Sequence, residues 1–136
     1  MVLGVGVDIL LIDRIGRASV DLSDPFIRKT FTQAEREQAV KRDDPTQYFA
    51  TRFAGKEAVY KSLGIDVSRG ALCEIEILND EKGAPSVILH GELLEIAKEK
   101  GISRVMISLS YDTDYAIAYA TALANERMEI NDKTYN

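Results

Sequence analysis

Cysteine, histidine and tryptophan are scarce in this sequence, and their scarcity excludes several kinds of site. The 136 residues include one cysteine, Cys73, one histidine, His90, and no tryptophan. A single cysteine allows no internal disulfide and is typical of a reducing cytoplasm, where we expect the protein to act. One histidine with one cysteine gives no basis for a zinc site or a histidine-based triad, and we expect His90, which closes a predicted strand, to be structural. The chemistry is therefore left to carboxylates, lysine and arginine.

Long hydrophobic runs are also absent. No apolar stretch approaches the ~20 residues of a membrane-spanning helix, so no membrane association is expected. The apolar N-terminal segment, residues 1–7, is not preceded by basic residues and is followed directly by Asp8, so no signal peptide is expected. With 46% hydrophobic and 29% charged residues, the composition is that of an ordinary soluble chain with one modest core.

The chain has no excess of positive charge. Its net charge of −5 argues against a general nucleic-acid binder. The charge is uneven, however, because residues 1–42 hold seven Lys/Arg against six Asp/Glu, and the remainder holds ten against sixteen. A local basic face near the N-terminus could meet an acidic partner.

What the sequence does contain is a strong signal for one long helix over residues 45–63. Asp44 followed by Pro45 reads as a helix cap with proline in the first turn, and Gly64 follows the last helical residue. The rest of the chain is organised around this helix.

The long helix carries a carboxylate inside its apolar stripe. At roughly 100° per residue, Glu57 falls between apolar positions, with Lys61 one turn beyond it. Burying an unpaired carboxylate is costly, so Glu57 should be neutralised by Lys61, bind a cation, or lie at the mouth of a cleft. A simple surface ion pair between Glu57 and Lys61 also fits the pattern, and the helix alone leaves this open.

A short strand is predicted over residues 3–7. Gly4 and Gly6 within it indicate close approach of another backbone. The pair resembles the start of a dinucleotide-binding fingerprint, but Ile9 stands where the third glycine should be, so that reading is rejected. Asp8 ends the strand, where the simplest role for an aspartate is to cap a helix.

The remaining elements predict an α+β fold, with a mainly antiparallel sheet packed on the long helix. Residues 1–124 should form a single domain, and residues 125–136 a polar, frayed tail. A capping box at Thr32 and Glu35 opens one further helix. Helical segments are expected from residue 11 and over 25–27, 32–42 and 91–100, and strands over 73–78, 85–89, 104–110 and 115–122.

Asp8 and Glu57 together suggest a metal site. Two hard oxygen ligands suit magnesium, which keeps several waters and completes its shell with substrate phosphates. Arg52, Lys56 and Lys61 on the long helix could hold those phosphates. Magnesium, a lysine and a bound diphosphate are the parts of a phosphoryl-transfer site.

Four stretches carry a resemblance to a known family. They are Gly4-Val5-Gly6-Val7-Asp8, Phe31-Thr32 with Glu35, Arg52-Phe53-Ala54-Gly55-Lys56-Glu57-Ala58 with Lys61 and Gly64, and Ile107-Ser108-Leu109-Ser110. In this order, over about residues 2–123, the chain resembles the holo-acyl-carrier-protein synthases, the small single-domain group of 4′-phosphopantetheinyl transferases. The resemblance implies a fold of that type. It also implies transfer of 4′-phosphopantetheine from coenzyme A to a serine of apo acyl carrier protein, with release of adenosine 3′,5′-bisphosphate, in fatty acid biosynthesis.

The resemblance also implies roles for individual residues. Asp8 and Glu57 would hold Mg²⁺, and Lys61 would neutralise the diphosphate, so these three are the candidate catalytic residues. The serine needs a base, and either Glu57 or a metal-bound water could serve. The residues implied to bind coenzyme A are Arg52, Lys56, Lys61, Gly64, Pro85, Ser110 and Tyr111.

Two kinds of partner surface are implied as well. Arg14, Arg28 and Lys29 would face the carrier protein, which is acidic in this family. Small members of the family are homotrimers with sites between subunits, so the hairpin around Lys82 and Pro85 would reach a neighbour's site.

One residue departs from the family pattern. Tyr111 follows Ser110 where a histidine that helps to hold the nucleotide end of coenzyme A is usual. A tyrosine donates a hydrogen bond but does not become a cation near neutral pH. The alternative is therefore a catalytically weakened module that binds coenzyme A or a carrier protein. A purely structural domain would require that the pairing of Asp8 with Glu57 be accidental.

Overall fold

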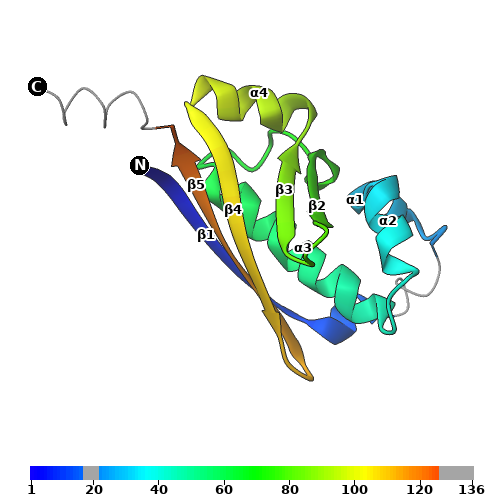
Figure 1. Ribbon diagram of the computed structural model, residues 1–136. Helices are drawn as coiled ribbons and strands as arrows, with labels where there is room; N and C mark the ends of the chain where they lie inside the picture. The colour runs from blue at the N-terminus through cyan, green and yellow to red at the C-terminus, as the bar shows by residue number, and fades with distance from the viewer. Residues whose placement is uncertain (17–21, 126–136) are drawn as a thin grey trace, which may run out of the picture.

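The computed structural model describes residues 1–16 and 22–125 (Figure 1). Its helices are α1 (Pro25–Thr30), α2 (Gln33–Ala39), α3 (Pro45–Ser62) and α4 (Gly91–Glu99), with 3₁₀ turns at Ile12–Arg14 and Leu72–Glu74. Its strands are β1 (Val2–Leu11), β2 (Ile75–Asn79), β3 (Pro85–Leu89), β4 (Ile102–Tyr111) and β5 (Tyr115–Ala124). The α+β prediction is confirmed. The predicted tail spans residues 125–136, of which all but Asn125 lie outside the described residues, so the tail stays a prediction.

The strands form two antiparallel sheets rather than one. β1, β5 and β4 lie side by side in that order, and β2 pairs with β3 as a separate hairpin. Figure 1 shows α3 running between the three-stranded sheet and the β2–β3 hairpin, with α1 and α2 at one end of it. The long helix is thus the centre of the molecule, which explains why most of its side chains are buried.

Small residues let α3 lie close to the three-stranded sheet. A Cβ atom added at Gly4 would lie 2.0 Å from the Ser62 carbonyl oxygen, and one at Gly6 would lie 2.0 Å from that of Ala58. The prediction of a close backbone approach at these glycines is confirmed. The residues of β5 on the same face are buried alanines: Ala116, Ala118, Ala120 and Ala122.

Asp8 lies within β1 rather than at its end. Alternate residues of a strand share a face, so Asp8 is on the face of Gly4 and Gly6 and is directed toward α3. The prediction that the strand ends at Asp8 is wrong, because pairing with β5 continues to Leu11 opposite Tyr115. The helix expected from residue 11 is only a 3₁₀ turn.

The helix boundaries follow the local signals in the sequence. The Asp44 carboxylate accepts a hydrogen bond from the Gln47 amide at 3.1 Å, and Thr32 and Glu35 form the predicted capping box. Gly64, just past α3, has φ +63°, a conformation that favours glycine. These caps rest on residues close in sequence, which is why the sequence could predict them.

The face of the three-stranded sheet turned away from α3 is apolar and uncovered within the described chain. We call it the outer sheet face. Its large apolar side chains are between 40% and 62% exposed: Val5, Val7, Ile9, Met106, Ile117 and Tyr119. In the part of the chain that the structure describes, none of the helices has the length and hydropathy of a membrane span.

Candidate active site

Asp8, Glu57 and Lys61 come together where β1 passes α3. The Lys61 Nζ atom lies 3.2 Å from the Asp8 Oδ1 atom and donates to the Val7 carbonyl oxygen at 2.9 Å. Glu57 lies one helical turn before Lys61 on the same helix. Lys61 is therefore paired with Asp8 on the strand, so the simple surface pair between Glu57 and Lys61 is not the arrangement observed.

Glu57 is partly buried beside a second carboxylate. Burial raises its pKa, the negative charge of Asp8 raises it further, and the Lys61 ammonium lowers it. The ionised form of Glu57 is thus held at a free-energy cost that a nearby cation would offset. Asp8 is paired with the exposed Lys61, so a further cation near Glu57 would offset the remaining negative charge of the two carboxylates.

The donor set suits magnesium better than a transition metal. Asp8 and Glu57 supply carboxylate oxygens, and no cluster of three or more His, Cys, Asp or Glu side chains suited to a metal occurs among residues 1–16 and 22–125. Mg²⁺ is commonly bound by one or two carboxylates, its remaining positions being filled by water and substrate phosphates. The two carboxylates therefore fit a magnesium ion shared with a phosphate substrate.

A pocket of about 340 Å³ opens beside this pair. Its walls come from α3 and from the loop that leads to β2. They are formed by Glu57, Tyr60, Lys61, Val67, Gly70, Ala71 and Leu72. A largely apolar pocket next to two carboxylates and a lysine can hold an uncharged arm attached to a phosphate group.

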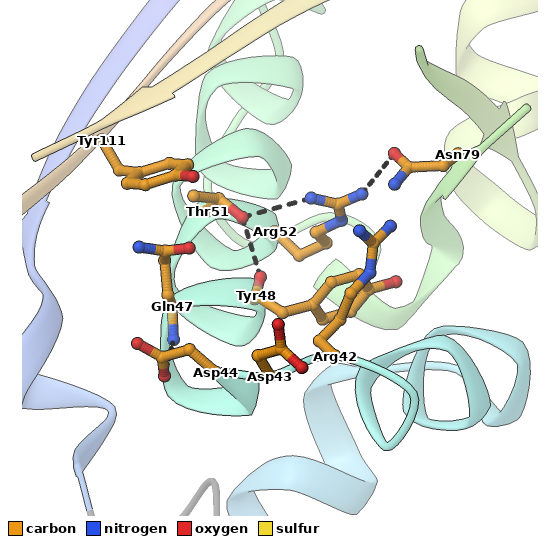
Figure 2. Close-up of a pocket in the computed structure, with 9 residues that line it drawn as sticks. All are labelled: Arg42, Asp43, Asp44, Gln47, Tyr48, Thr51, Arg52, Asn79 and Tyr111. Carbon is orange, nitrogen blue, oxygen red and sulfur yellow. Dashed lines mark hydrogen bonds between the residues drawn. The ribbon is translucent and has the colours of Figure 1, made fainter. Parts of the chain in front are cut away.

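A second pocket, of about 280 Å³, lies at the N-terminal half of α3 (Figure 2). We call it the arginine pocket; it is lined by Arg42, Asp43, Asp44, Gln47, Tyr48, Thr51, Arg52, Asn79 and Tyr111. An adjoining pocket of about 290 Å³ shares four of these residues and extends to Gly83, Pro85, Ile107, Ser108 and Leu109. Arg52, Pro85 and Tyr111, three residues implied to bind coenzyme A, thus line one continuous region.

Arg52 is a buried cation in this pocket. Its side chain donates to the Asn79 Oδ1 atom at 2.5 Å and to the Thr51 Oγ1 atom at 3.2 Å (Figure 2). Its Nε atom is buried without a partner, and no carboxylate among the described residues forms an ion pair with it. Burial lowers its pKa. A buried guanidinium with a free donor is suited to an anionic ligand.

Lys56 does not face either pocket, which corrects the expectation that it binds a phosphate. Its side chain is fully buried, and its Nζ atom lies 2.7 Å from the Glu35 Oε1 atom. It also donates to the carbonyl oxygens of Leu72 and Ile75. With these partners, the ammonium belongs to a core ion pair that joins α2, α3 and the start of β2.

The other predicted site residues lie apart from these two centres. Gly64 follows the end of α3, where its carbonyl oxygen accepts a hydrogen bond from Lys100. Ser110 lines a shallow pocket near the turn of the β4–β5 hairpin, together with Tyr111. Arg14, in the first 3₁₀ turn, and Arg28 and Lys29, in the last turn of α1, are exposed.

His90, the only histidine, lies outside both pockets. His90 is half exposed, and its Nε2 atom lies 3.2 Å from the Glu76 Oε1 atom, away from both pockets. This contact fits the structural role expected of His90.

Sequence reasoning missed Arg42, Tyr48 and Asn79 in the arginine pocket. Tyr48 stands one helical turn before Arg52, and that spacing was the available signal.

Comparisons with known proteins give consistent similarities. Residues 4–120 match the family model described as the 4′-phosphopantetheinyl transferase superfamily. A holo-[acyl-carrier-protein] synthase from Desulforudis audaxviator is 39% identical over 123 residues, which cover 90% of this chain and 94% of that protein.

Solved structures are similar over the same span. The holo-[acyl-carrier-protein] synthase of Neisseria meningitidis has a TM-score of 0.80 and 33% identity, covering 90% of this chain and 99% of that one. A complex of ACPS with CoA from Chronobacterium ammoniagenes has a TM-score of 0.74 and 29% identity, covering 90% of this chain and 97% of that one.

Proposed function

The chain belongs to the holo-[acyl-carrier-protein] synthases of the 4′-phosphopantetheinyl transferase superfamily, and from this premise we propose how its own residues carry out the transfer. The substrate is coenzyme A, and the partner is an apo acyl carrier protein, whose serine receives the 4′-phosphopantetheine group. The reaction is magnesium-dependent, releases adenosine 3′,5′-bisphosphate and takes place in the cytoplasm, where it serves fatty acid biosynthesis.

One observation carries the proposal: Asp8 on β1 lies close enough to Glu57 on α3 to raise its pKa, and Lys61 on α3 pairs with Asp8. Asp8 and Glu57 would hold Mg²⁺, which would supply charge stabilisation at the diphosphate of coenzyme A. Lys61 leaves Asp8 and neutralises a diphosphate oxygen, which its exposed position permits. Glu57 is the base on this chain that accepts the proton of the incoming serine hydroxyl.

The two ends of coenzyme A occupy different pockets. The pantetheine arm lies in the pocket between Glu57 and Leu72, which adjoins the reacting phosphate. The nucleotide end, with its 3′-phosphate, lies in the arginine pocket, which Arg42 and Arg52 line with two positive charges. The apolar side near Pro85 takes the base, because an aromatic base gains from burying its faces. Arg14, Arg28 and Lys29 face the acidic carrier protein.

The protein assembles as a homotrimer through the outer sheet face. Exposed apolar patches of this kind mark interaction sites, and the two pockets are shallow for a ligand as large as coenzyme A. The hairpin around Lys82 and Pro85, together with the arginine pocket that adjoins it, then completes a site whose Asp8, Glu57 and Lys61 come from a neighbouring copy.

We predict that Ile117→Lys converts the trimer to monomers, because a buried unpaired ammonium at a packed interface is costly. Light scattering at working concentration measures the change. Val40→Lys is the matched control, since Val40 is also exposed but caps the C-terminus of α2, away from the outer sheet face. A wild-type protein that is monomeric in the same experiment would contradict the assembly.

We also predict that Tyr111→His lowers the Michaelis constant for coenzyme A about fivefold with little change in turnover number. A histidine can offer a charge-assisted hydrogen bond to a phosphate, which is worth about 1 kcal/mol more than the neutral bond of a phenol. Tyr111→Phe should weaken binding if the hydroxyl contacts the ligand. If both variants bind coenzyme A as the wild type does, Tyr111 lies outside the site.

Product release tests the proposed function. The protein, coenzyme A and Mg²⁺ are incubated with and without apo carrier, and adenosine 3′,5′-bisphosphate is quantified by chromatography. Release that requires the carrier is the expected result. If the protein binds coenzyme A but releases no adenosine 3′,5′-bisphosphate, it is instead the catalytically weakened binding module, the alternative that Tyr111 suggests.

A further inference from the structure

Tyr48 contacts both arginines of the arginine pocket. The Cζ atom of Arg52 lies 4.1 Å from the centroid of the Tyr48 ring, and that of Arg42 lies 5.5 Å from it. Tyr48 is 5% exposed, and it precedes Arg52 by one turn of α3 (Figure 2). The Tyr48 ring therefore contacts two guanidinium groups, that of Arg52 on its own helix and that of Arg42 from the segment before this helix.

The hydroxyl of Tyr48 is fixed by a chain of hydrogen bonds. It donates to the Gln38 Oε1 atom at 3.0 Å, and the same oxygen accepts from the Asn79 amide at 3.2 Å. The Asn79 side chain in turn accepts from Arg52 at 2.5 Å. Residues from α2, α3 and β2 thus hold the ring and the guanidinium in one relative position.

Arg42 and Arg52 lie near each other, and neither forms an ion pair with a carboxylate of the described residues. Their mutual repulsion therefore has to be offset by other contacts. The charge of Arg42 is close enough to lower the pKa of Arg52. The negative face of an aromatic ring attracts guanidinium groups and offsets part of their repulsion. Arg52 lines the pocket and forms no ion pair with a carboxylate of the described residues, which leaves its charge for an anionic ligand.

We propose that Tyr48 is a positioning residue that holds Arg52, and with it Arg42, in place to receive the 3′-phosphate of coenzyme A. The inference rests on the proposed function, since it needs the nucleotide end of coenzyme A in the arginine pocket. Tyr48 touches the arginines rather than the reacting atoms, so it acts on affinity and not on the chemical step.

The test measures dissociation constants for coenzyme A and for dephospho-coenzyme A, which lacks the 3′-phosphate, by calorimetry. Tyr48→Leu, which removes the ring, should weaken coenzyme A binding about tenfold, which corresponds to about 1.4 kcal/mol. Its affinity for dephospho-coenzyme A and its turnover number at saturating coenzyme A should stay within about twofold of wild type. Tyr48→Phe keeps the ring and should restore most of the affinity.

Phe49→Leu is the matched control, because Phe49 is the next residue of α3, is fully buried and does not line the pocket. It should lower the melting temperature without changing the affinity for coenzyme A. If Tyr48→Leu does not fold, Tyr48→Met takes its place.

The outcomes separate this inference from the proposed function. If the wild-type protein transfers phosphopantetheine and Tyr48→Leu binds coenzyme A as tightly as the wild type, the inference is overturned and the proposed function stands. Equal weakening by Tyr48→Leu and Tyr48→Phe, or equal loss for both ligands, also overturns it. Wild-type protein that binds no coenzyme A overturns both.

Discussion

Glu57→Gln is expected to lower the turnover number for phosphopantetheine transfer by about a thousandfold or more. A neutral amide is a poor ligand for a hard dication, and it cannot accept the serine proton. Metal stabilisation of transition-state charge is worth several kcal/mol, and each ~1.4 kcal/mol is a factor of ten in rate. The measurement is the initial rate of product release at saturating coenzyme A and carrier.

The fold of Glu57→Gln should be intact, because Glu57 is only partly buried and the amide is isosteric. Burial and Asp8 both raise the pKa of Glu57, so removing its charge should not destabilise the protein. Glu99→Gln, at the exposed end of α4, is the control for a lost carboxylate elsewhere. A Glu57→Gln variant with near-wild-type turnover would exclude Glu57 from the reaction.

Lys56→Met is expected to reduce the free energy of unfolding by about 3–5 kcal/mol, because it leaves the fully buried Glu35 carboxylate without its cation. That is a large fraction of the roughly 5–15 kcal/mol that stabilises a typical domain. Glu35 has further structural contacts, since it accepts from the Thr32 amide and the Ile77 amide, each at 2.9 Å. Urea unfolding of both proteins measures the difference.

The double variant Glu35→Gln with Lys56→Met should recover part of the loss, because it removes both charges together. Arg69→Met breaks the exposed pair with Glu92 and should cost less than about 1 kcal/mol. If Lys56→Met is as stable as wild type but binds coenzyme A poorly, the earlier assignment of Lys56 to phosphate binding is restored.

Local signals in the sequence predicted the helix boundaries and the close contact between β1 and α3. The capping residues Thr32, Asp44 and Gly64 marked helix boundaries correctly, because their contacts lie within one or two turns. Gly4 and Gly6 marked the close approach of α3, because a strand has few other reasons for paired glycines. Asp8 and Glu57 were paired because both carboxylates depart from the pattern around them and suit Mg²⁺, and the resemblance to a family then implied the same pair.

Contacts between distant segments could not be predicted in the same way. Lys56 looked like a phosphate ligand because its partner, Glu35, lies on α2 and was read only as part of a capping box. β1 passes Asp8 because its pairing with β5 outweighs the local signal for a strand end. Arg52 was expected to bind phosphate, but its support from Tyr48 and Asn79 depends on how α3 meets β2.

The intact mass of apo acyl carrier protein, after incubation with this protein, coenzyme A and Mg²⁺, tests the central claim most directly. The account predicts that the carrier gains one phosphopantetheine group on serine. It also predicts that the gain disappears with a chelator or with Glu57→Gln. An unchanged carrier mass under conditions where the wild-type protein binds coenzyme A would contradict the account.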